Sequence, residues 1–369
     1  MRKGRKMNEH EFETYLTTGV ENVVKDLLKA SLFHPSESAF MLRFAAASKH
    51  ANTIRHNFEQ QGEHVPPFLI ASITSICNLH CAGCYARSLD SCNDESPVKQ
   101  LSAEQWGRVF DEARELGISF ILLAGGEPMV RKDVIEEAAN YPEILFPIFT
   151  NGTLIDDREL NFIDKHRNLI PVFSVEGGQL ATDTRRGEGI FDKVQSVMLK
   201  MQEQRIAFGA SVTVTTENIR EVTSDNFVKN LIDNGCKLIF YIEYVPTAHS
   251  SESLALNNEQ REQLAYRVDE LRASNSSALF ISFPGDEKLS DGCLAAGRGF
   301  FHINSRGGAE PCPFSPYSDI NVIETSLREA LKSKLFLALR SGDILLDEHD
   351  GGCVLFQKRN EVEKLLSSR

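Results

Sequence analysis

Short apolar runs alternate with amphipathic segments through the middle of the chain. Between residues 68 and 246, each of six runs rich in β-branched and aromatic residues is followed by apolar positions at helical spacing. The six predicted strands are 69–74, 118–123, 145–150, 170–175, 207–214 and 238–245. Strands separated by helices build a parallel sheet, either doubly wound or closed partway into a barrel. In both arrangements, functional side chains gather at the carboxyl ends of the strands.

The two ends of the chain have different patterns. Residues 1–66 show two helical stripes of apolar side chains, from Val20 to Leu32 and from Phe40 to Phe58, and Pro66 follows. After the sixth strand, a helix at 258–273 and a strand at 279–283 lead into a stretch rich in glycine and cysteine. We therefore predict three regions: an N-terminal helical region, 1–66; an α/β core, 67–285; and a small separate module, 286–369.

Composition limits the class of protein. The 369 residues are 41% hydrophobic and 25% charged, as in globular proteins large enough to bury a core without disulfides. No apolar run approaches the roughly 18 residues that span a bilayer, and the basic start is not followed by the apolar stretch of a signal peptide. The net charge of −12 argues against a nucleic-acid partner. We expect a cytoplasmic protein without a membrane span.

Eight cysteines are distributed unevenly along the chain. Three of them, Cys77, Cys81 and Cys84, fall within eight residues, directly after the first predicted strand. In a chain without a signal peptide, clustered thiols are more typical of metal or cluster ligands than of disulfides. Three cysteines can bind three irons of a [4Fe-4S] cluster and leave the fourth iron open. The alternative is a structural zinc site with His80 as the fourth ligand.

The Cys-x3-Cys-x2-Cys spacing, followed by Tyr85, resembles the signature of the radical S-adenosylmethionine (radical SAM) superfamily. The second predicted strand ends in Gly125-Gly126-Glu127, which is similar to the motif that binds the methionyl amino group in that family. Glycines let a ligand approach the backbone, and a carboxylate accepts hydrogen bonds from an ammonium group. The resemblance implies a partial (β/α)6 TIM-type barrel that binds a [4Fe-4S] cluster and S-adenosyl-L-methionine.

Further polar residues follow the later strands. The resemblance implies cofactor contacts at Asn151, Ser174, Glu176, Arg186 and Ser211, with Thr213 and Asn218 close by. Relatives commonly have Asp where this chain has Glu176. Turn formation or helix capping would explain several of these residues equally well.

A second group of cysteines lies in the last quarter of the chain. Cys293, Gly307 and Cys312 have a spacing similar to the opening of the SPASM and twitch extensions, which hold auxiliary [4Fe-4S] clusters in family members. The resemblance implies a SPASM/twitch-like α+β module with one auxiliary cluster on Cys293, Cys312 and Cys353. The fourth position is open or filled by a residue such as His349 or Asp350. The alternative is three buried structural cysteines. Cys92 and Cys236 fit no motif.

The resemblance implies reductive cleavage of S-adenosylmethionine to a 5'-deoxyadenosyl radical, which abstracts hydrogen from a substrate. We expect a peptide or protein substrate, and a reducing partner such as flavodoxin or ferredoxin. A small molecule such as an alcohol, sugar or lipid is the second hypothesis, and an iron-sulfur electron-transfer or assembly protein is the third. An N-terminal region forming a groove beside the barrel mouth would favour a peptide, whereas one plugging the mouth would favour a small substrate.

Overall fold

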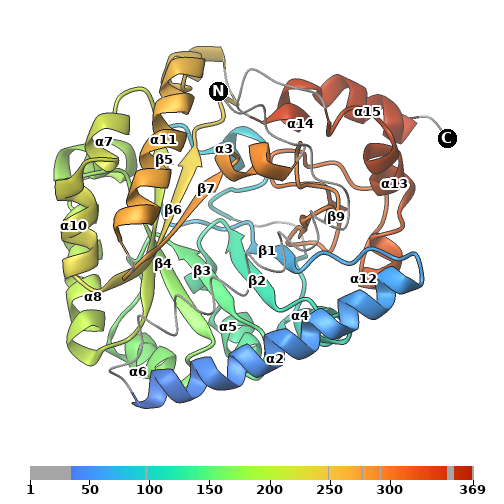
Figure 1. Cartoon of the computed structure of the whole chain (residues 1–369), viewed down its shortest axis with the longest axis horizontal. Helices are drawn as coiled ribbons and strands as arrows, with labels where there is room; N and C mark the ends of the chain where they lie inside the picture. Colours follow the sequence, from blue (N-terminus) through green and yellow to red (C-terminus); the bar gives the residue numbers. More distant parts are fainter. Residues whose placement is uncertain are drawn as a thin grey trace.

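A single sheet of nine strands organises the molecule (Figure 1). The computed structural model describes residues 35–95, 99–247, 249–275, 277–290, 292–346 and 353–367. The strands lie in the order β7-β6-β5-β4-β3-β2-β1-β8-β9, and every neighbouring pair is parallel except β8 and β9. Their bounds are β1 Phe68–Thr74, β2 Phe120–Gly125, β3 Phe146–Thr150, β4 Leu169–Val175, β5 Phe208–Val214, β6 Cys236–Glu243, β7 Leu279–Phe283, β8 Phe300–Ile303 and β9 Ala309–Glu310.

The fold prediction is confirmed. All six predicted strands are present within a few residues of their expected bounds, and they pair in sequence order. The alternating pattern allowed either a doubly wound sheet or a partly closed barrel. The structure has the second arrangement, because the sheet curves into an unclosed barrel. The strand expected at 279–283 is present as β7 and pairs with β6, and the structure adds β8 beside β1, so the parallel part of the sheet extends beyond the six alternating strands on both sides.

Helices cover the outer face of the sheet (Figure 1). The hydrophobic core lies between these helices and the outward residues of the strands, with Trp106, Phe110 and Phe146 completely buried. Helix α4 begins with a capping box between Ser102 and Gln105, which satisfies backbone groups at its start. In the core region the helices are α3 Tyr85–Ser88, α4 Ala103–Glu115, α5 Lys132–Ala138, α6 Asp157–Lys165, α7 Gln179–Arg186, α8 Ile190–Gln204, α9 Ile219–Val222, α10 Asp225–Asp233 and α11 Asn258–Ser274, with 3-10 turns η1 Pro128–Val130 and η2 His249–Leu254.

Helix α2 (Pro35–Gln60) runs across the end of the barrel where the strands begin (Figure 1). Its apolar stripe packs Phe40 and Phe44 onto Phe120, Leu145 and Ile170, which lie at or beside the first residues of β2, β3 and β4. The helix therefore lies opposite the barrel mouth. It neither forms a groove beside the mouth nor plugs it, so it cannot discriminate between the two substrate classes as expected. The predicted stripe at 20–32 lies outside the described residues.

The C-terminal region is joined to the core through the sheet. Strand β8 pairs in parallel with β1, from Phe68 opposite Phe300 to Ala71 opposite Ile303. Strand β9 then returns antiparallel to β8 as a short hairpin around Gly307. The segment expected as a separate module thus shares the sheet of the core. Its remaining elements are η3 Gly285–Ser290 and helices α12 Leu327–Ala330, α13 Lys334–Ser341, α14 Val354–Gln357 and α15 Arg359–Ser367.

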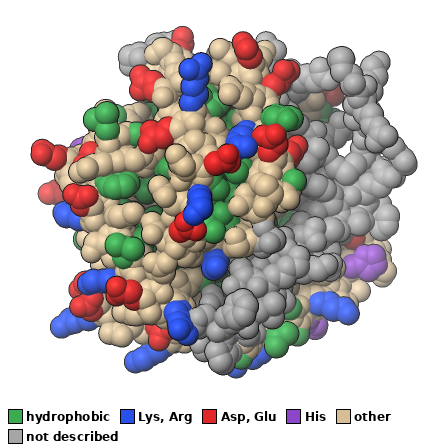
Figure 2. Space-filling view, turned by 60° about the vertical axis from the view of Figure 1, so that its left-hand side comes forward, with side chains coloured by type: hydrophobic (Ala, Val, Ile, Leu, Met, Phe, Trp, Pro, Cys, Tyr) green, Lys and Arg blue, Asp and Glu red, His purple; other side chains and the backbone are tan. Residues whose placement is uncertain are grey.

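The surface is mixed in charge on the side where α7, α8 and α10 lie. Figure 2 shows acidic and basic side chains interspersed there, with small apolar groups between them. Among the described residues, no helix is both long enough and apolar enough to cross a membrane.

Candidate iron-sulfur and S-adenosylmethionine site

The three clustered cysteines lie on the loop that leaves the carboxyl end of β1. Cys77, Cys81 and Cys84 are all partly exposed and free. The backbone N–H of Ala82 donates to Arg185 O at 2.8 Å, which ties the middle of the loop to α7. The structure therefore presents three accessible thiols from one short loop at the open end of the barrel, which fits the ligand set of a cluster with one open iron.

Gly125 and Gly126 bring the end of β2 against this loop. A Cβ atom at Gly125 would lie 2.1 Å from Thr74 O, and one at Gly126 would lie 2.1 Å from Ile76 O. The N–H groups of Gly126 and Glu127 donate to the same two carbonyls, each at 2.8 Å. Because both residues lack a side chain, the loop that bears the three cysteines can pack against the β2 backbone. The sequence motif alone indicated that these glycines allow the approach of a ligand.

The Glu127 carboxylate is already hydrogen-bonded within the protein. Its Oε1 accepts from Thr150 Oγ1 at 2.6 Å and from Met129 N at 3.0 Å, and its Oε2 accepts from Asn151 N at 2.7 Å. Burial raises the pKa of this carboxyl to about 7, although the three donors oppose the shift. Because Oε2 accepts only one hydrogen bond, the carboxylate keeps acceptor capacity, and the expected contact of Glu127 with an ammonium group stays a prediction. Its carboxylate joins the end of β2 to the end of β3.

Asn151 extends this connection to the cysteine loop. Its Nδ2 donates to Asn78 Oδ1 at 2.9 Å, and Asn78 Nδ2 donates to Thr153 Oγ1 at 2.8 Å. Asn78 directly follows Cys77, so the turn after β3 holds the first cysteine of the loop in place. In this structure Asn151 has a positioning role.

Arg186 connects Glu176 to the second cysteine. Its guanidinium binds the Glu176 carboxylate through two hydrogen bonds of 2.6 Å, and its Nη1 lies 3.8 Å from Cys81 Sγ. Burial raises the pKa of the Cys81 thiol, and the nearby Arg186 charge opposes that shift. The Arg186 guanidinium therefore favours the thiolate form of Cys81, and the Glu176 carboxylate paired with it acts in the opposite direction.

Cys92 lies beside Cys77, a contact that its position in the sequence did not indicate. The interaction between the two side chains lowers the pKa of Cys77 to about 6 and raises that of Cys92. Cys92 is buried, whereas Cys77 is partly exposed. No signal in the spacing of the motif could have identified this partner.

Ser174 and Ser211 lie side by side, paired between β4 and β5. Because side chains alternate along a strand, Ser174 shares the inner face of the barrel with Val172, which is buried against Leu238 and Phe240. Asn218 instead closes a turn, since its Nδ2 donates to the carbonyls of Glu176 and Thr213, both at 2.9 Å. The serines face the barrel interior, whereas Asn218 supports the turn beside it.

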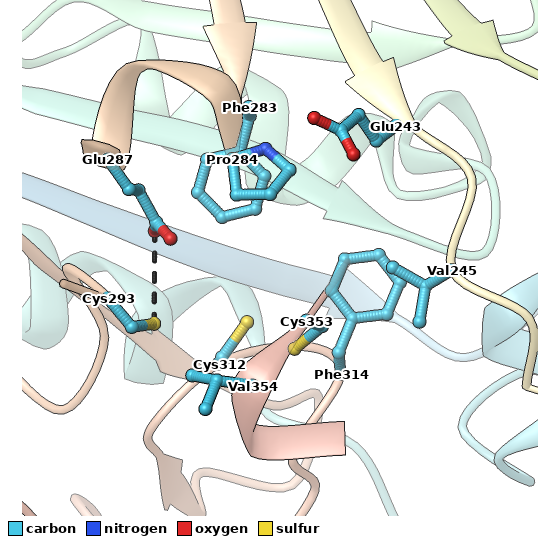
Figure 3. A pocket seen from close by; sticks show the side chains of 10 residues that line it. All are labelled: Glu243, Val245, Phe283, Pro284, Glu287, Cys293, Cys312, Phe314, Cys353 and Val354. Atoms are coloured by element: carbon cyan, nitrogen blue, oxygen red, sulfur yellow. Dashed lines mark hydrogen bonds between the residues drawn. The ribbon is translucent and has the colours of Figure 1, made fainter. Parts of the chain in front are cut away.

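The three C-terminal cysteines surround one cavity (Figure 3). Cys293 and Cys312 are buried and Cys353 is partly buried, and all three are free. Cys312 and Cys353 interact directly, and burial raises the pKa of both Cys293 and Cys312. The cavity is also lined by Glu243, Val245, Phe283, Pro284, Glu287, Phe314 and Val354. The structure therefore brings together three thiols that are separated widely in sequence, while His349 and Asp350 lie outside the described residues.

Aromatic and polar residues lie between the two cysteine groups. Tyr85, next to Cys84, packs against Phe314 with ring centroids 4.6 Å apart, and Phe314 lines the C-terminal cavity. Nearby, His302 on β8 joins Ser72 Oγ and Glu310 Oε2, both at 2.7 Å. The buried histidine links β1 to the hairpin and was not identified from the sequence, because no motif contains it.

Within the described residues, no three His, Cys, Asp or Glu side chains are packed as they would be around a single metal ion. Tetrahedral zinc holds thiolates at about 2.3 Å and therefore needs them close together. A multi-iron cluster distributes its thiolates over several irons and does not require that packing.

Comparison with known proteins gives the same classification as the cysteine motif. The model of the radical SAM superfamily matches residues 71–228. The AdoMet-dependent heme synthase of Methanosarcina barkeri is 25% identical over 76% of this chain and 86% of its own length. The sporulation killing factor maturation protein SkfB of Bacillus subtilis is 24% identical over 72% of this chain and 65% of its own length. The crystal structure of Streptococcus suis SuiB bound to precursor peptide SuiA has 18% identity and a TM-score of 0.65, over 86% of this chain and 76% of SuiB.

Proposed function

The chain belongs to the radical SAM superfamily and is an enzyme that uses S-adenosylmethionine, and from this premise we propose its cofactor sites and substrate class. Cys77, Cys81 and Cys84 bind the [4Fe-4S] cluster that the family implies. The observation that supports this most directly is the single loop of accessible thiols at the carboxyl end of β1. When bound, such a cluster supplies the electron that splits S-adenosylmethionine into methionine and a 5'-deoxyadenosyl radical, which then takes a hydrogen atom from the substrate. The electron itself comes from a reducing partner such as flavodoxin or ferredoxin.

The residues around the loop position and protect this chemistry. Arg186 compensates the negative charge of the thiolates, and Asn151 holds the start of the loop. Ser174 and Ser211 provide hydroxyl groups for the cofactor on the inner face of the barrel. The apolar interior below them, with Val172, excludes water from a reactive radical.

Cys293, Cys312 and Cys353 bind an auxiliary [4Fe-4S] cluster. Thiolates are the preferred ligands of such clusters, and these three come from different segments that the fold brings to one cavity. Buried structural cysteines would not need to meet in this way. The aromatic contact between Tyr85 and Phe314 places this cavity near the first cysteine loop.

A peptide or protein is the proposed substrate. The support is the sequence similarity to SkfB, whose name describes maturation of a sporulation killing factor, and the fold shared with SuiB, which was crystallised with a precursor peptide. A small molecule is the second candidate, because the similarity to a heme synthase covers more of the relative's length.

The assay for the first cluster is 5'-deoxyadenosine release from S-adenosylmethionine under strong reductant, in anaerobically reconstituted protein. Cys81→Ala should abolish release, because the cluster loses one of its three ligands. Cys236→Ala is the matched control, since Cys236 is buried in β6 away from both cysteine groups and should keep most of the activity. Release that survives in Cys81→Ala would refute the assignment.

The substrate class can be tested through the hydrogen atom itself. A fully deuterated cell extract is separated by size into a polypeptide fraction and a small-molecule fraction, and each is added to the enzyme. Deuterium should appear in 5'-deoxyadenosine with the polypeptide fraction. Deuterium transfer from the small-molecule fraction alone would reject the peptide proposal in favour of the second candidate.

A further inference from the structure

We propose that Glu287 provides the fourth ligand of the C-terminal iron-sulfur site. This inference rests on the proposed auxiliary cluster at Cys293, Cys312 and Cys353 and identifies the group that completes it. With Glu287 bound, all four irons have protein ligands at rest. The site then serves electron transfer and does not bind substrate at an open iron.

The carboxylate of Glu287 points into the cavity that the three cysteines line. Glu287 lies in η3, the turn that follows β7, and Figure 3 shows its side chain directed toward Cys293. Its Oε1 is 3.8 Å from Cys293 Sγ, and the residue is only 6% exposed. The carboxylate and the three thiols thus approach a common space from separate segments.

Protein groups occupy only one of the two carboxylate oxygens. Oε1 accepts from the Cys293 thiol and from Leu294 N at 3.3 Å, whereas no described group donates to Oε2. The salt bridges among the described residues do not include Glu287 either. The Arg298 charge acts on this carboxylate without a salt bridge between them among the described contacts, and Arg298 Nη1 donates to Cys293 O at 2.7 Å. A buried carboxylate without a salt-bridge partner is costly, and coordination to a metal ion offsets that cost. Its surroundings therefore favour a cation at this place.

Glu243 lines the same cavity but is already engaged. Its Oε2 accepts from Arg261 Nε at 2.9 Å, and both side chains are at most 10% exposed. The charge of Glu243 is thus compensated by a partner on α11. Of the two carboxylates that line the cavity, Glu287 is the one available to iron.

The test begins with a parent protein, Cys77→Ala/Cys81→Ala/Cys84→Ala, that lacks the first cluster, so that iron reports only on the C-terminal site. Glu287→Gln, Glu287→Cys and the control Glu243→Gln are made in this parent and reconstituted anaerobically. The readouts are iron content, Mössbauer spectra with ⁵⁷Fe, and the change in the electron paramagnetic resonance spectrum of the reduced cluster on addition of ¹³C-cyanide, which binds an open iron.

The parent should contain about four irons per chain and show no cyanide effect. Glu287→Gln should keep three or four irons and gain cyanide binding, and Glu287→Cys should restore a closed cluster. Glu243→Gln should resemble the parent in iron content and cyanide response, although loss of the buried ion pair with Arg261 should lower its unfolding free energy. Rescue by cysteine distinguishes a ligand from a residue that only supports the fold.

Two outcomes would overturn the inference in distinguishable ways. A parent with about four irons that already binds cyanide, or whose spectra do not change in Glu287→Gln, would remove Glu287 as the ligand and leave the auxiliary cluster intact. His349→Ala and Asp350→Ala, each made in the same parent and measured in the same way, would then identify the fourth ligand. A parent with no iron, but with the circular dichroism of the unaltered protein, would remove the auxiliary cluster itself.

Discussion

At the scale of single residues, buried polar side chains hold the cysteine loop in place. Asn151 Nδ2 donates to Asn78 Oδ1 in the loop, Glu127 accepts from the backbone N–H of Asn151, and Arg186 Nη1 lies 3.8 Å from Cys81 Sγ. The sequence motifs identified these residues, but they could not show which of them face a cofactor and which face the protein. That distinction depends on hydrogen-bond partners from other strands, such as Thr150, which no local pattern specifies.

Glu176→Gln should destabilise the protein, because it leaves the Arg186 charge buried without its carboxylate. Breaking one side of a buried ion pair typically costs about 3–5 kcal/mol of unfolding free energy. Urea unfolding of the apoprotein measures this value. Glu188→Gln, an exposed site just after α7, is the control and should change the unfolding free energy by less than about 0.5 kcal/mol. Equal effects in the two variants would contradict the role of the pair.

Glu127 should make the stability of the apoprotein depend on pH. Its pKa is raised by burial from 4.5 to about 7, so between these values the folded state holds a proton that the unfolded chain releases. The stability contributed by this group is complete below pH 4.5 and is lost as pH rises through about 7. Urea unfolding at pH 5, 6, 7 and 8 should show a decline that is smaller in Glu127→Gln. The exposed-site control Glu262→Gln should keep the decline, and a Glu127→Gln profile parallel to that of the unaltered protein would refute this origin.

At the scale of elements, strands and helices were predictable because their periodicity is strong. The run at 69–74 became β1 at Phe68–Thr74, and the helix expected at 258–273 became α11 at Asn258–Ser274. The position of α2 was not predictable, since an amphipathic stripe shows that a face is buried but not which surface covers it. The same limit applies to β8, because this strand has only four residues and its partner, β1, lies far away in the sequence at the start of the core.

Phe44→Ala should test the closure of the barrel by α2. Phe44 is fully buried and packs edge-on against Phe120, with ring centroids 5.5 Å apart. Removing a buried phenylalanine costs about 3–5 kcal/mol of unfolding free energy, through lost burial and the cavity that remains. Leu42→Ala on the same helix is the control, because Leu42 is 64% exposed. Thermal unfolding of both variants should show a clearly larger decrease in Tm for Phe44→Ala, and equal decreases would show that this contact is unimportant.

At the scale of the whole molecule, the two cysteine groups belong to one body. The shared sheet, through β1 and β8, and the contact between Tyr85 and Phe314 connect them. The sequence indicated both groups but described the second as part of a separate module, because the pairing of β8 with β1 leaves no local trace. Glu287 was missed for a related reason, since it has no motif spacing and its significance comes from the thiols that the fold brings to it.

Cys312→Ala should separate the two proposed clusters functionally. The reconstituted variant should retain about four irons, compared with about eight in the unaltered protein, because the first loop keeps all of its ligands. It should still release 5'-deoxyadenosine, but without product formation from the substrate. Iron analysis and the 5'-deoxyadenosine assay measure these quantities together. Loss of all iron in Cys312→Ala, with the fold intact, would show that the two sites do not assemble independently.

The pairing of β8 with β1 also affects how the chain is synthesised. Strand β1 is the first strand of the core to leave the ribosome, and it pairs with β2 and β8 in the folded sheet. Its partner β2 is translated soon afterwards, whereas β8 is translated only after the rest of the barrel. During that interval one edge of β1 carries unpaired backbone groups, which can pair with other chains. The loop that bears Cys77, Cys81 and Cys84 follows directly from this strand. We therefore expect iron to enter the proposed site at this loop after translation ends, when β8 has paired with β1.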